Sequence, residues 1–238
     1  MLVAVDIGNT NIVLGFLDGD AIAGTYRITT KANHTSDEYG LFLTEFLRMS
    51  GFQPSDVDDV IICSVVPKVM HSFRSSIVKF LDIDPMVVGP GIKTGMNVRV
   101  DDPKSLGADI LADCAGAYYE YGGPVLVADF GTATTFNVVD ENKVFRGGVI
   151  CPGLSTGLRA LGERCAQLPQ VHLSSPKSAI GIDTEKCMLS GSVLGTAVLL
   201  DGITQRIEEE LGRPATLVVT GGLAKYVAPL CRHPLTYD

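Results

Sequence analysis

The sequence lacks the patterns that mark zinc-binding and secreted proteins. Its six cysteines, at positions 63, 114, 151, 165, 187 and 231, form no C-x-x-C pair, and its four histidines are scattered. A zinc site therefore has no support. Most of these cysteines stand among apolar or small residues, which predicts buried thiols and a reducing compartment.

Segments that would direct the chain to a membrane are also missing. Met1 is followed at once by the apolar run 2–5, so we expect no signal peptide. No apolar run reaches the roughly 20 residues that a bilayer-spanning helix needs. We therefore expect a cytoplasmic protein with no membrane partner.

Charge is sparse and predominantly negative. Charged residues make up 19% of the chain, and the formal net charge is −8. An acidic surface repels polyphosphate backbones at long range, so we expect no nucleic-acid partner. Apolar residues make up 46%, which excludes disordered and collagen-like classes. With 238 residues, the chain can form one large domain or two lobes of about 100 residues each.

The first half shows a pattern typical of a mixed α/β sheet. Short apolar runs separated by Gly, Asn and Asp predict strands joined by tight turns. Thr35 and Glu38 fit a capping box for a helix that Gly51 can close. Pro67 can start a second helix, with Met70, Phe73, Ile77 and Phe80 on one face. The predicted strands are 2–6, 12–20, 21–28 and 60–63, and a third helix is predicted over about 106–119.

The second half begins with the same pattern. A strand over 125–129 ends at Asp129, as the first strand ends at Asp6, and each Asp precedes a Gly by two positions. Two more strands follow, then helices over about 153–165 and 183–211 and a last strand over 217–219. An internal duplication explains this repeat, and a chance likeness of two sheet starts is the alternative. We predict lobes over 1–121 and 122–238.

The segment Asp6-x-Gly8-Asn9-Thr10-Asn11 is the first candidate site. Gly8 can turn with φ > 0 and let a phosphate approach the backbone, whose successive amides can bind an anion. Asp6 would face that phosphate only through a cation, and Mg²⁺ suits one carboxylate plus phosphates. The alternative is an ordinary hairpin with turn residues.

Two further segments have similar chemistry. Asp129-x-Gly131-Thr132-Ala133-Thr134-Thr135 again offers a carboxylate and a Gly-Thr turn, although its three threonines also suit a strand. Thr220-Gly221-Gly222 ends the last strand, where glycines let a flat ligand lie close to the backbone; a plain strand-to-helix turn is the alternative. In a duplicated fold the two Asp-Gly loops would face each other as a clamp for a polyphosphate.

Together the three segments resemble the phosphate-1, phosphate-2 and adenosine motifs of the actin, Hsp70 and sugar-kinase superfamily. Over almost the full length, the chain more closely resembles type III pantothenate kinases. The segments that carry this likeness are 6–11, 63–67, 107–109, 129–136, 147–148, 152–154, 159–161, 168–169 and 220–222. The resemblance implies an α/β, duplicated ribonuclease-H-like (actin-like ATPase) fold with two lobes around a nucleotide cleft.

The resemblance also implies the reaction and its residues. The reaction would be ATP-dependent phosphorylation of pantothenate, the first step toward coenzyme A, in a homodimer. Asp109 would accept the hydroxyl proton, although an Asp in the first turn of a helix can simply interact with the helix dipole. Asp6 would lie near Mg²⁺, and Asp129 would help to hold K⁺ or NH₄⁺. The residues implied for ATP are Asp6, Ile7, Gly8, Asn9, Thr10, Asn11, Ile12, Val13, Thr132, Gly221 and Gly222. Those implied for pantothenate are Val100, Gly107, Ala108, Asp109, Ile110 and Thr184, the last acting across the dimer interface.

The chain departs from the family pattern at four places. Ile110 stands where an Arg is usual, and Ile cannot form paired hydrogen bonds with a carboxylate. Val100 replaces a frequent Tyr, Asn137 replaces a frequent Asp, and the chain ends at Asp238, before the family's usual C-terminal segment. Two alternative functions follow: a catalytically weak regulator like the Bvg accessory factors, or a kinase for another small hydroxylated acid.

Overall fold

The computed structural model describes residues 1–19, 21–89 and 91–238, so Asp20, the last residue of the predicted strand segment 12–20, lies outside the described residues. The chain divides into two compact units. One comprises Met1–Lys93 with Lys104–Ala112, and the other comprises Thr94–Pro103 with Asp113–Asp238. Helix α3 (Ala108–Tyr121) contributes to both units. The predicted division between residues 121 and 122 remains a prediction.

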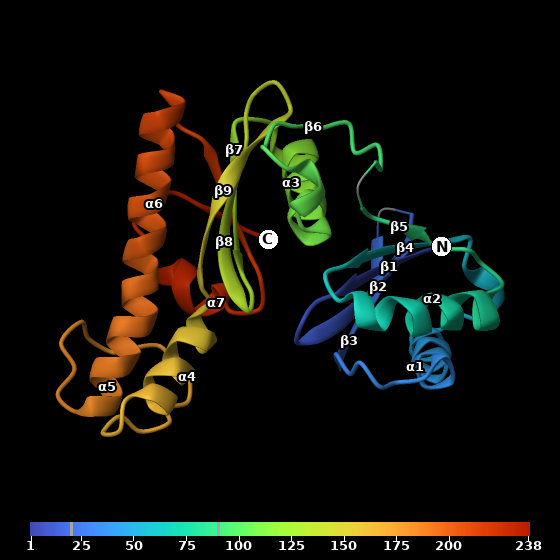
Figure 1. The fold of residues 1–238 in the computed structure, drawn as a ribbon, viewed down its shortest axis with the longest axis horizontal. Coiled ribbons are helices and arrows are strands. Elements are labelled where there is room, and N and C mark those ends of the chain that lie inside the picture. The colour runs from blue at the N-terminus through green and yellow to red at the C-terminus, as the bar shows by residue number, and fades with distance from the viewer. Residues whose placement is uncertain (20, 90) are drawn as a thin grey trace. The chain divides into compact units, whose positions relative to one another are not determined.

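The first unit is a five-stranded sheet covered on one face by two helices (Figure 1). Its strand order is β3-β2-β1-β4-β5, with β2 antiparallel to β1 and β3, and β4 parallel to β1 and β5. The strands are β1 (Leu2–Ile7), β2 (Asn11–Asp18), β3 (Ala21–Thr29), β4 (Asp59–Ser64) and β5 (Met86–Val87), and the helices are α1 (Ser36–Met49) and α2 (Pro67–Leu81). Two 3₁₀ turns lie at Pro54–Asp56 and Pro103–Ser105.

Alternation along the strands decides which face of this sheet is buried. Val3, Val5 and Ile7 are buried in the core that α1 and α2 cover. Because successive side chains of a strand point to opposite faces, Asp6 points to the other face, where it is exposed. This second face, which we call the open face, therefore presents the Asp6 carboxylate.

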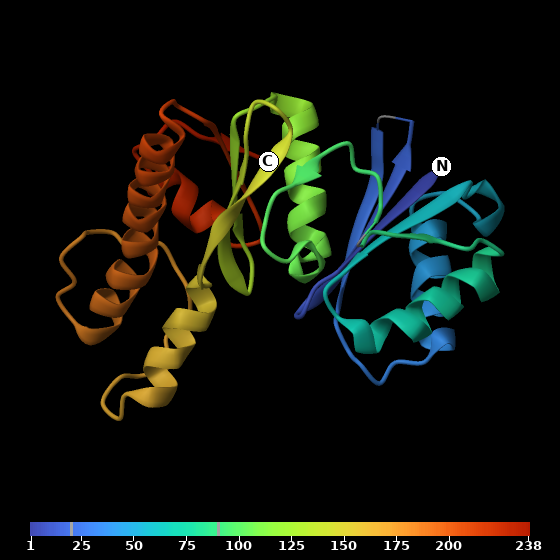
Figure 2. The same cartoon turned by 45° about the horizontal axis from the view of Figure 1, so that its top comes forward.

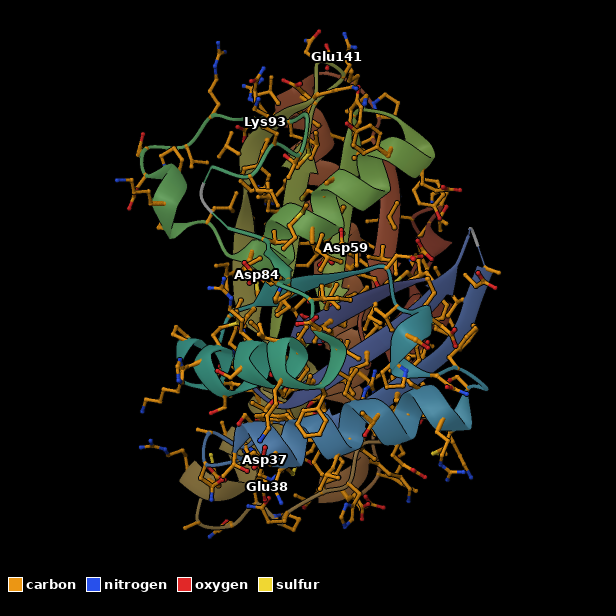
Figure 3. The ribbon with its side chains drawn as sticks, turned by 90° about the vertical axis from the view of Figure 1, so that its right-hand side faces the viewer. Asp37, Glu38, Asp59, Asp84, Lys93 and Glu141 are labelled. Atoms are coloured by element: carbon orange, nitrogen blue, oxygen red, sulfur yellow. The ribbon has the colours of Figure 1, made fainter. Side chains whose placement is uncertain are left out.

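The first helix begins and packs as its sequence predicts. Thr35 and Glu38 form the predicted capping box, and Figure 3 marks this end of α1 by Asp37 and Glu38. Asp37 accepts a hydrogen bond from Lys79 of α2 at 2.6 Å. A Cβ added to Gly40 would lie 2.2 Å from the Phe80 ring, so this glycine lets α1 and α2 approach closely.

The second unit repeats this architecture in a six-stranded sheet of order β11-β10-β7-β8-β9-β6. Figure 2 shows α6 on one face of that sheet and α3 on the other. The strands are β6 (Asn97–Val98), β7 (Val125–Phe130), β8 (Ala133–Val139), β9 (Val144–Pro152), β10 (Thr216–Thr220) and β11 (Thr236–Tyr237). The helices are α4 (Leu154–Arg164), α5 (Thr184–Leu189), α6 (Gly195–Leu211) and α7 (Ala224–Val227), with a 3₁₀ turn at Ala228–Leu230.

The predicted duplication is confirmed by strand order, strand direction and register. Leaving out the edge strand β6, the order β9-β8-β7-β10-β11 matches β3-β2-β1-β4-β5, and corresponding pairs run in the same sense. Asp6 pairs with Val13 and Cys63, as Asp129 pairs with Thr135 and Thr220. Asp6 and Asp129 therefore occupy corresponding positions in the two units.

One helical stretch of the described residues, Thr184–Leu211, is long and apolar enough to cross a membrane by length and composition alone. It consists of α5, a π-helical segment over Ser190–Leu194, and α6. Val193, Ala197 and Leu200 are fully buried in the core of the second unit. That packing against the sheet is typical of a core helix.

Three predictions need correction. Among the cysteines, Cys114 is buried, three are half-buried, and Cys165 and Cys187 are exposed, so most are not buried thiols. The third helix begins at Ala108 rather than near 106. Strand β8 begins at Ala133, so Thr134 and Thr135 belong to the strand and the second loop is shorter than expected.

Candidate active site

The first predicted loop, Gly8–Thr10, is a tight turn between β1 and β2. The amide of Gly8 donates to the carbonyl oxygen of Asn11 at 3.0 Å. Thr30, which follows β3, holds the loop from the side: its Oγ1 donates to the carbonyl of Gly8 at 2.6 Å, and its amide donates to the carbonyl of Thr10 at 3.0 Å. These bonds fix the backbone whose amides would meet a phosphate.

Gly8 does not have the positive φ that the sequence suggested, so that prediction is wrong. The reason for a glycine here is space. A Cβ at this position would lie 3.3 Å from the carbonyl oxygen of Asn11, tighter than an ordinary contact. The closed turn therefore favours glycine by close approach rather than by backbone conformation.

Charged groups from distant segments gather at Asp6 within the first unit. Loss of hydration and then the negative charge of Asp109 raise the pKa of the Asp6 carboxyl above its ordinary value, while the positive charge of Arg27 opposes the rise. Two carboxylates whose charges repel are best accommodated when a cation lies between or beside them. This pairing suits Mg²⁺, which takes one or two carboxylates and completes its shell with phosphates and water.

Asp109 lies in the first turn of α3, where it is half-buried. Its Oδ1 accepts the backbone N–H of Ile110 at 2.8 Å, so this side chain interacts with the helix start as well as electrostatically with Asp6. A Cβ added to Gly107 would lie 2.4 Å from that same Oδ1. The glycine thereby leaves room for the Asp109 carboxylate at the helix start.

The second loop is built like the first. The amide of Gly131 donates to the carbonyl of Ala133 at 3.0 Å, and Thr156 Oγ1 donates to the carbonyl of Thr132 at 2.8 Å. A Cβ added to Gly153 would lie 2.2 Å from the Thr132 carbonyl oxygen. In both units, then, a threonine from outside the loop anchors a loop carbonyl.

The structure brings the second and third motifs together at Asp129. Gly221 has φ +97°, and a Cβ there would lie 2.3 Å from Asp129 Oδ1. Gly131 approaches the same carboxylate, with its ideal Cβ position 3.3 Å from Oδ2. Glycine at both positions lets these two turns approach the Asp129 carboxylate closely. Carboxylate oxygens are ligands of the kind that a hard monovalent cation accepts.

The residues predicted to bind pantothenate come from both units and from α5. Val100 belongs to the second unit, whereas Gly107, Ala108, Asp109 and Ile110 belong to the first. Thr184 is the exposed first residue of α5, whose start is capped by Asp183. Asn137 is buried in β8, and its Nδ2 donates to Thr135 Oγ1 at 2.9 Å.

A shallow depression of about 320 Å³ lies in the second unit between α4 and the π-helical stretch. No predicted site residue lines it. Its lining residues include Pro152, Gly153, Gly157, Gly191 and Thr196. Gly153, one of its lining residues, also lies against the carbonyl groups of Gly131 and Thr132, so the depression adjoins the second loop.

Sequence reasoning missed Thr30, Thr156 and Arg27. The two threonines act through loop carbonyls, and Arg27 acts through its charge on Asp6. None of the three stands within or beside the motif that it serves. A strand register would have been needed to place Arg27 beside Asp6.

The strand order, the two loops and the duplicated carboxylates define an actin-like ATPase fold, as predicted. Solved structures match over nearly the whole chain, among them the two that follow. A Baf family putative transcriptional activator from Campylobacter jejuni has a TM-score of 0.58 at 18% identity, covering 99% of this chain and 90% of its own. The ROK hexokinase from Thermus thermophilus has a TM-score of 0.50 at 12% identity, covering 99% and 92%. These likenesses concern the fold.

Sequence comparison identifies the family within this fold class. The family model for type III pantothenate kinase matches residues 2–206. A type III pantothenate kinase from Bifidobacterium longum is 72% identical over 229 residues, which are 94% of this chain and 88% of that protein. The chain belongs to the type III pantothenate kinase family.

Proposed function

We propose that this chain transfers the γ-phosphoryl group of ATP to the primary hydroxyl of pantothenate, giving 4′-phosphopantothenate and ADP in the first step of coenzyme A synthesis. The observation that supports this most strongly is the 72% identity to the Bifidobacterium longum relative over 94% of the chain. Both Asp-Gly loops that the reaction would use are intact and anchored.

In this reaction the hydroxyl oxygen of pantothenate forms a bond to the γ-phosphorus, and the bond from that phosphorus to the bridging oxygen of ADP breaks. Asp109 takes the hydroxyl proton and later releases it to water. The remaining task is positioning and charge neutralisation, because phosphoryl transfer requires little covalent chemistry from the protein. Backbone amides of the segment Asp6–Val13 and the Thr132 hydroxyl would bind the phosphates, and Gly221 and Gly222 would lie against the adenosine.

Two cations belong to the proposal. Asp6 would hold Mg²⁺, which neutralises phosphate charge when bound; among the described residues no group of three or more acidic, His or Cys side chains could hold a metal alone, so the nucleotide would supply the other ligands. Asp129 would contribute to a K⁺ or NH₄⁺ site, where the backbones of Gly131 and Gly221 approach its carboxylate closely. Replacing potassium by sodium in the assay is then expected to lower turnover.

Pantothenate would contact Val100, Gly107, Ala108, Asp109 and Ile110, and Thr184 from a second copy of the chain would complete the site. This makes a homodimer the functional unit. A cytoplasmic location agrees with substrates and products of this kind. The free cysteines of the described residues agree with a reducing compartment.

The decisive experiment is an assay of the purified chain with Mg-ATP and a panel of hydroxylated acids that includes pantothenate. We expect phosphorylation of pantothenate above all others, detected as 4′-phosphopantothenate by mass. If the chain prefers another acid, that acid replaces pantothenate as the proposed substrate. Nucleotide binding without turnover on any acid would favour the regulatory function that Ile110, in place of the usual Arg, makes a reasonable alternative.

A further inference from the structure

The open face of the first unit carries a cation aligned with the first loop. Asp6 of β1 pairs with Val13 of β2, and Val13 pairs with Arg27 of β3. The three side chains therefore stand in one row on the same face, with the two charged groups two strand spacings apart, about 10 Å between their backbones. An arginine side chain is long enough to reach toward the neighbouring strand.

The surroundings leave this guanidinium available. Within the described residues, Arg27 has no carboxylate within ion-pair distance, and its side chain is exposed, whereas Arg48 and Arg74 of the same unit are each paired with an acid. Small residues flank the row on the same face, at Ala4 and Gly15. Arg27 can therefore bind an anion without giving up an existing ion pair.

The duplication provides an internal comparison. The corresponding row in the second unit is Asp129, Thr135 and Ile150, so Ile150 occupies the position of Arg27. The strand pairing is kept with an isoleucine there, which shows that the fold does not need an arginine at this place in the sheet. The positive charge of Arg27 therefore has a purpose other than holding the sheet together.

Phosphate chemistry supplies that explanation. The loop segment 6–13 contains no Lys or Arg, although phosphoryl transfer ordinarily uses a side-chain cation on the transferring group. The charges of both Asp109 and Arg27 act on Asp6. A cation beside Asp6 lies near the phosphates that Asp6 would hold through Mg²⁺.

We propose that Arg27 is the side-chain cation of the first loop and binds the terminal phosphate of ATP, the group that is transferred. This inference rests on the proposed kinase reaction. The planar guanidinium of Arg27 can donate two parallel hydrogen bonds to phosphate oxygens, which a lysine cannot. Arg27 thus stabilises the charge on the γ-phosphoryl group during transfer.

The test compares Arg27→Gln and Arg27→Lys with Arg48→Gln, an exposed arginine of the same unit on α1. Turnover of pantothenate is measured, and Mg-ATP and Mg-ADP are titrated by calorimetry. Arg27→Gln is expected to lower kcat by on the order of a hundredfold, as loss of one transition-state donor does. It is also expected to weaken Mg-ATP binding about tenfold while leaving Mg-ADP binding unchanged. Arg27→Lys is expected to recover part of the kcat and part of the Mg-ATP affinity. Arg48→Gln is expected to match wild type in both.

Other outcomes overturn the inference. If Arg27→Gln turns over like Arg48→Gln, or weakens ATP and ADP equally, Arg27 does not bind the terminal phosphate. If the wild type phosphorylates no acid, the proposed function fails, and the ATP-to-ADP difference alone decides the role of Arg27. A wild type that binds neither nucleotide overturns both.

Discussion

At the scale of single residues, Asp6 stands in an unfavourable electrostatic setting. Loss of hydration and the Asp109 charge raise the pKa of its carboxyl, and only Arg27 opposes this rise. A structural carboxylate would normally be paired or hydrogen-bonded. The setting is typical of a functional group that awaits a cation.

Replacing Asp6 by asparagine is expected to lower kcat strongly and to leave the fold intact, because one cation-binding charge is lost while shape is kept. Turnover is measured at saturating Mg-ATP, with thermal unfolding as the check on folding. Asp18→Asn, an exposed carboxylate at the end of β2, serves as the control. Wild-type turnover in Asp6→Asn would remove Asp6 from the magnesium site.

Ile110 is the second residue whose role can be tested directly. If an arginine here normally contacts the substrate, its absence weakens pantothenate binding by one charge-assisted hydrogen bond, about 1.5–3 kcal/mol or roughly ten- to a hundredfold. Ile110→Arg is therefore expected to lower KM for pantothenate and to leave nucleotide affinity unchanged. Ile110→Met controls for side-chain length without charge.

Calorimetric titration of both ligands separates this expectation from its rival, in which Arg99 or Arg159 makes the contact. Tight pantothenate binding by the wild type, with no gain in Ile110→Arg, would support the rival.

At the scale of elements, α6 holds the C-terminal segment through two acids. Asp201 accepts the backbone N–H groups of Arg232 and His233, at 3.0 Å each. The His233 ring faces two acceptors, the Pro234 carbonyl at 2.9 Å and Glu208 Oε2 at 3.1 Å. Both ring nitrogens can donate only when the imidazole is protonated.

These contacts of His233 predict that the local stability of the C-terminal segment depends on pH. Burial alone would lower the pKa of His233, but the Pro234 carbonyl, Glu208 and Asp201 together raise it above its ordinary value. The pKa of an unfolded histidine is about 6.5. Because folding raises the pKa of His233, its contribution to the stability of the folded segment is complete below that value. The contribution is lost as the pH rises through the pKa of the folded state. The effect is on the order of 1 kcal/mol.

Amide hydrogen exchange of residues 232–238, corrected for intrinsic rates, measures this local stability. Protection is expected to fall from pH 6 to pH 8 in the wild type and to be low throughout in His233→Gln. His71→Gln, an exposed histidine on α2, should behave like wild type. Equal pH dependence of this protection in His233→Gln and wild type would contradict the role proposed for His233.

At the scale of the whole molecule, the proposed site requires two copies of the chain, because Thr184 is assigned to the partner's site. Mixing Asp109→Asn with Thr184→Ala tests this. Half of the randomly formed dimers are mixed, and each has one intact site, so activity is expected to recover to about a quarter of wild type.

Each variant alone should be nearly inactive, and mixing Asp109→Asn with Asp6→Asn gives the matched control, since both residues belong to one copy's site. No recovery in the first mixture would place Thr184 in its own chain's site or outside any site. Sedimentation velocity of the wild type establishes the oligomeric state independently.

The sequence alone was enough for the features that depend on short spacing. The capping box at Thr35 and the first strand of each half follow from residues close together in the chain. The structure confirms them, with each strand ending one residue beyond Asp6 or Asp129. The duplication follows from comparing the two halves, and the matching strand orders confirm it. Local patterns suffice here because strand alternation and helix capping are set by neighbours.

Only the tertiary structure decided which distant residues support the site. Strand register places Arg27 in line with Asp6, and close packing brings Gly221 against Asp129. The same is true of Thr30 and Thr156, whose hydroxyl groups anchor the two loops. These contacts depend on how strands align across a sheet, and a shift of one residue would turn each side chain to the opposite face. Sequence periodicity determines the faces of a strand, whereas the partner that each residue meets is determined only when the sheet assembles.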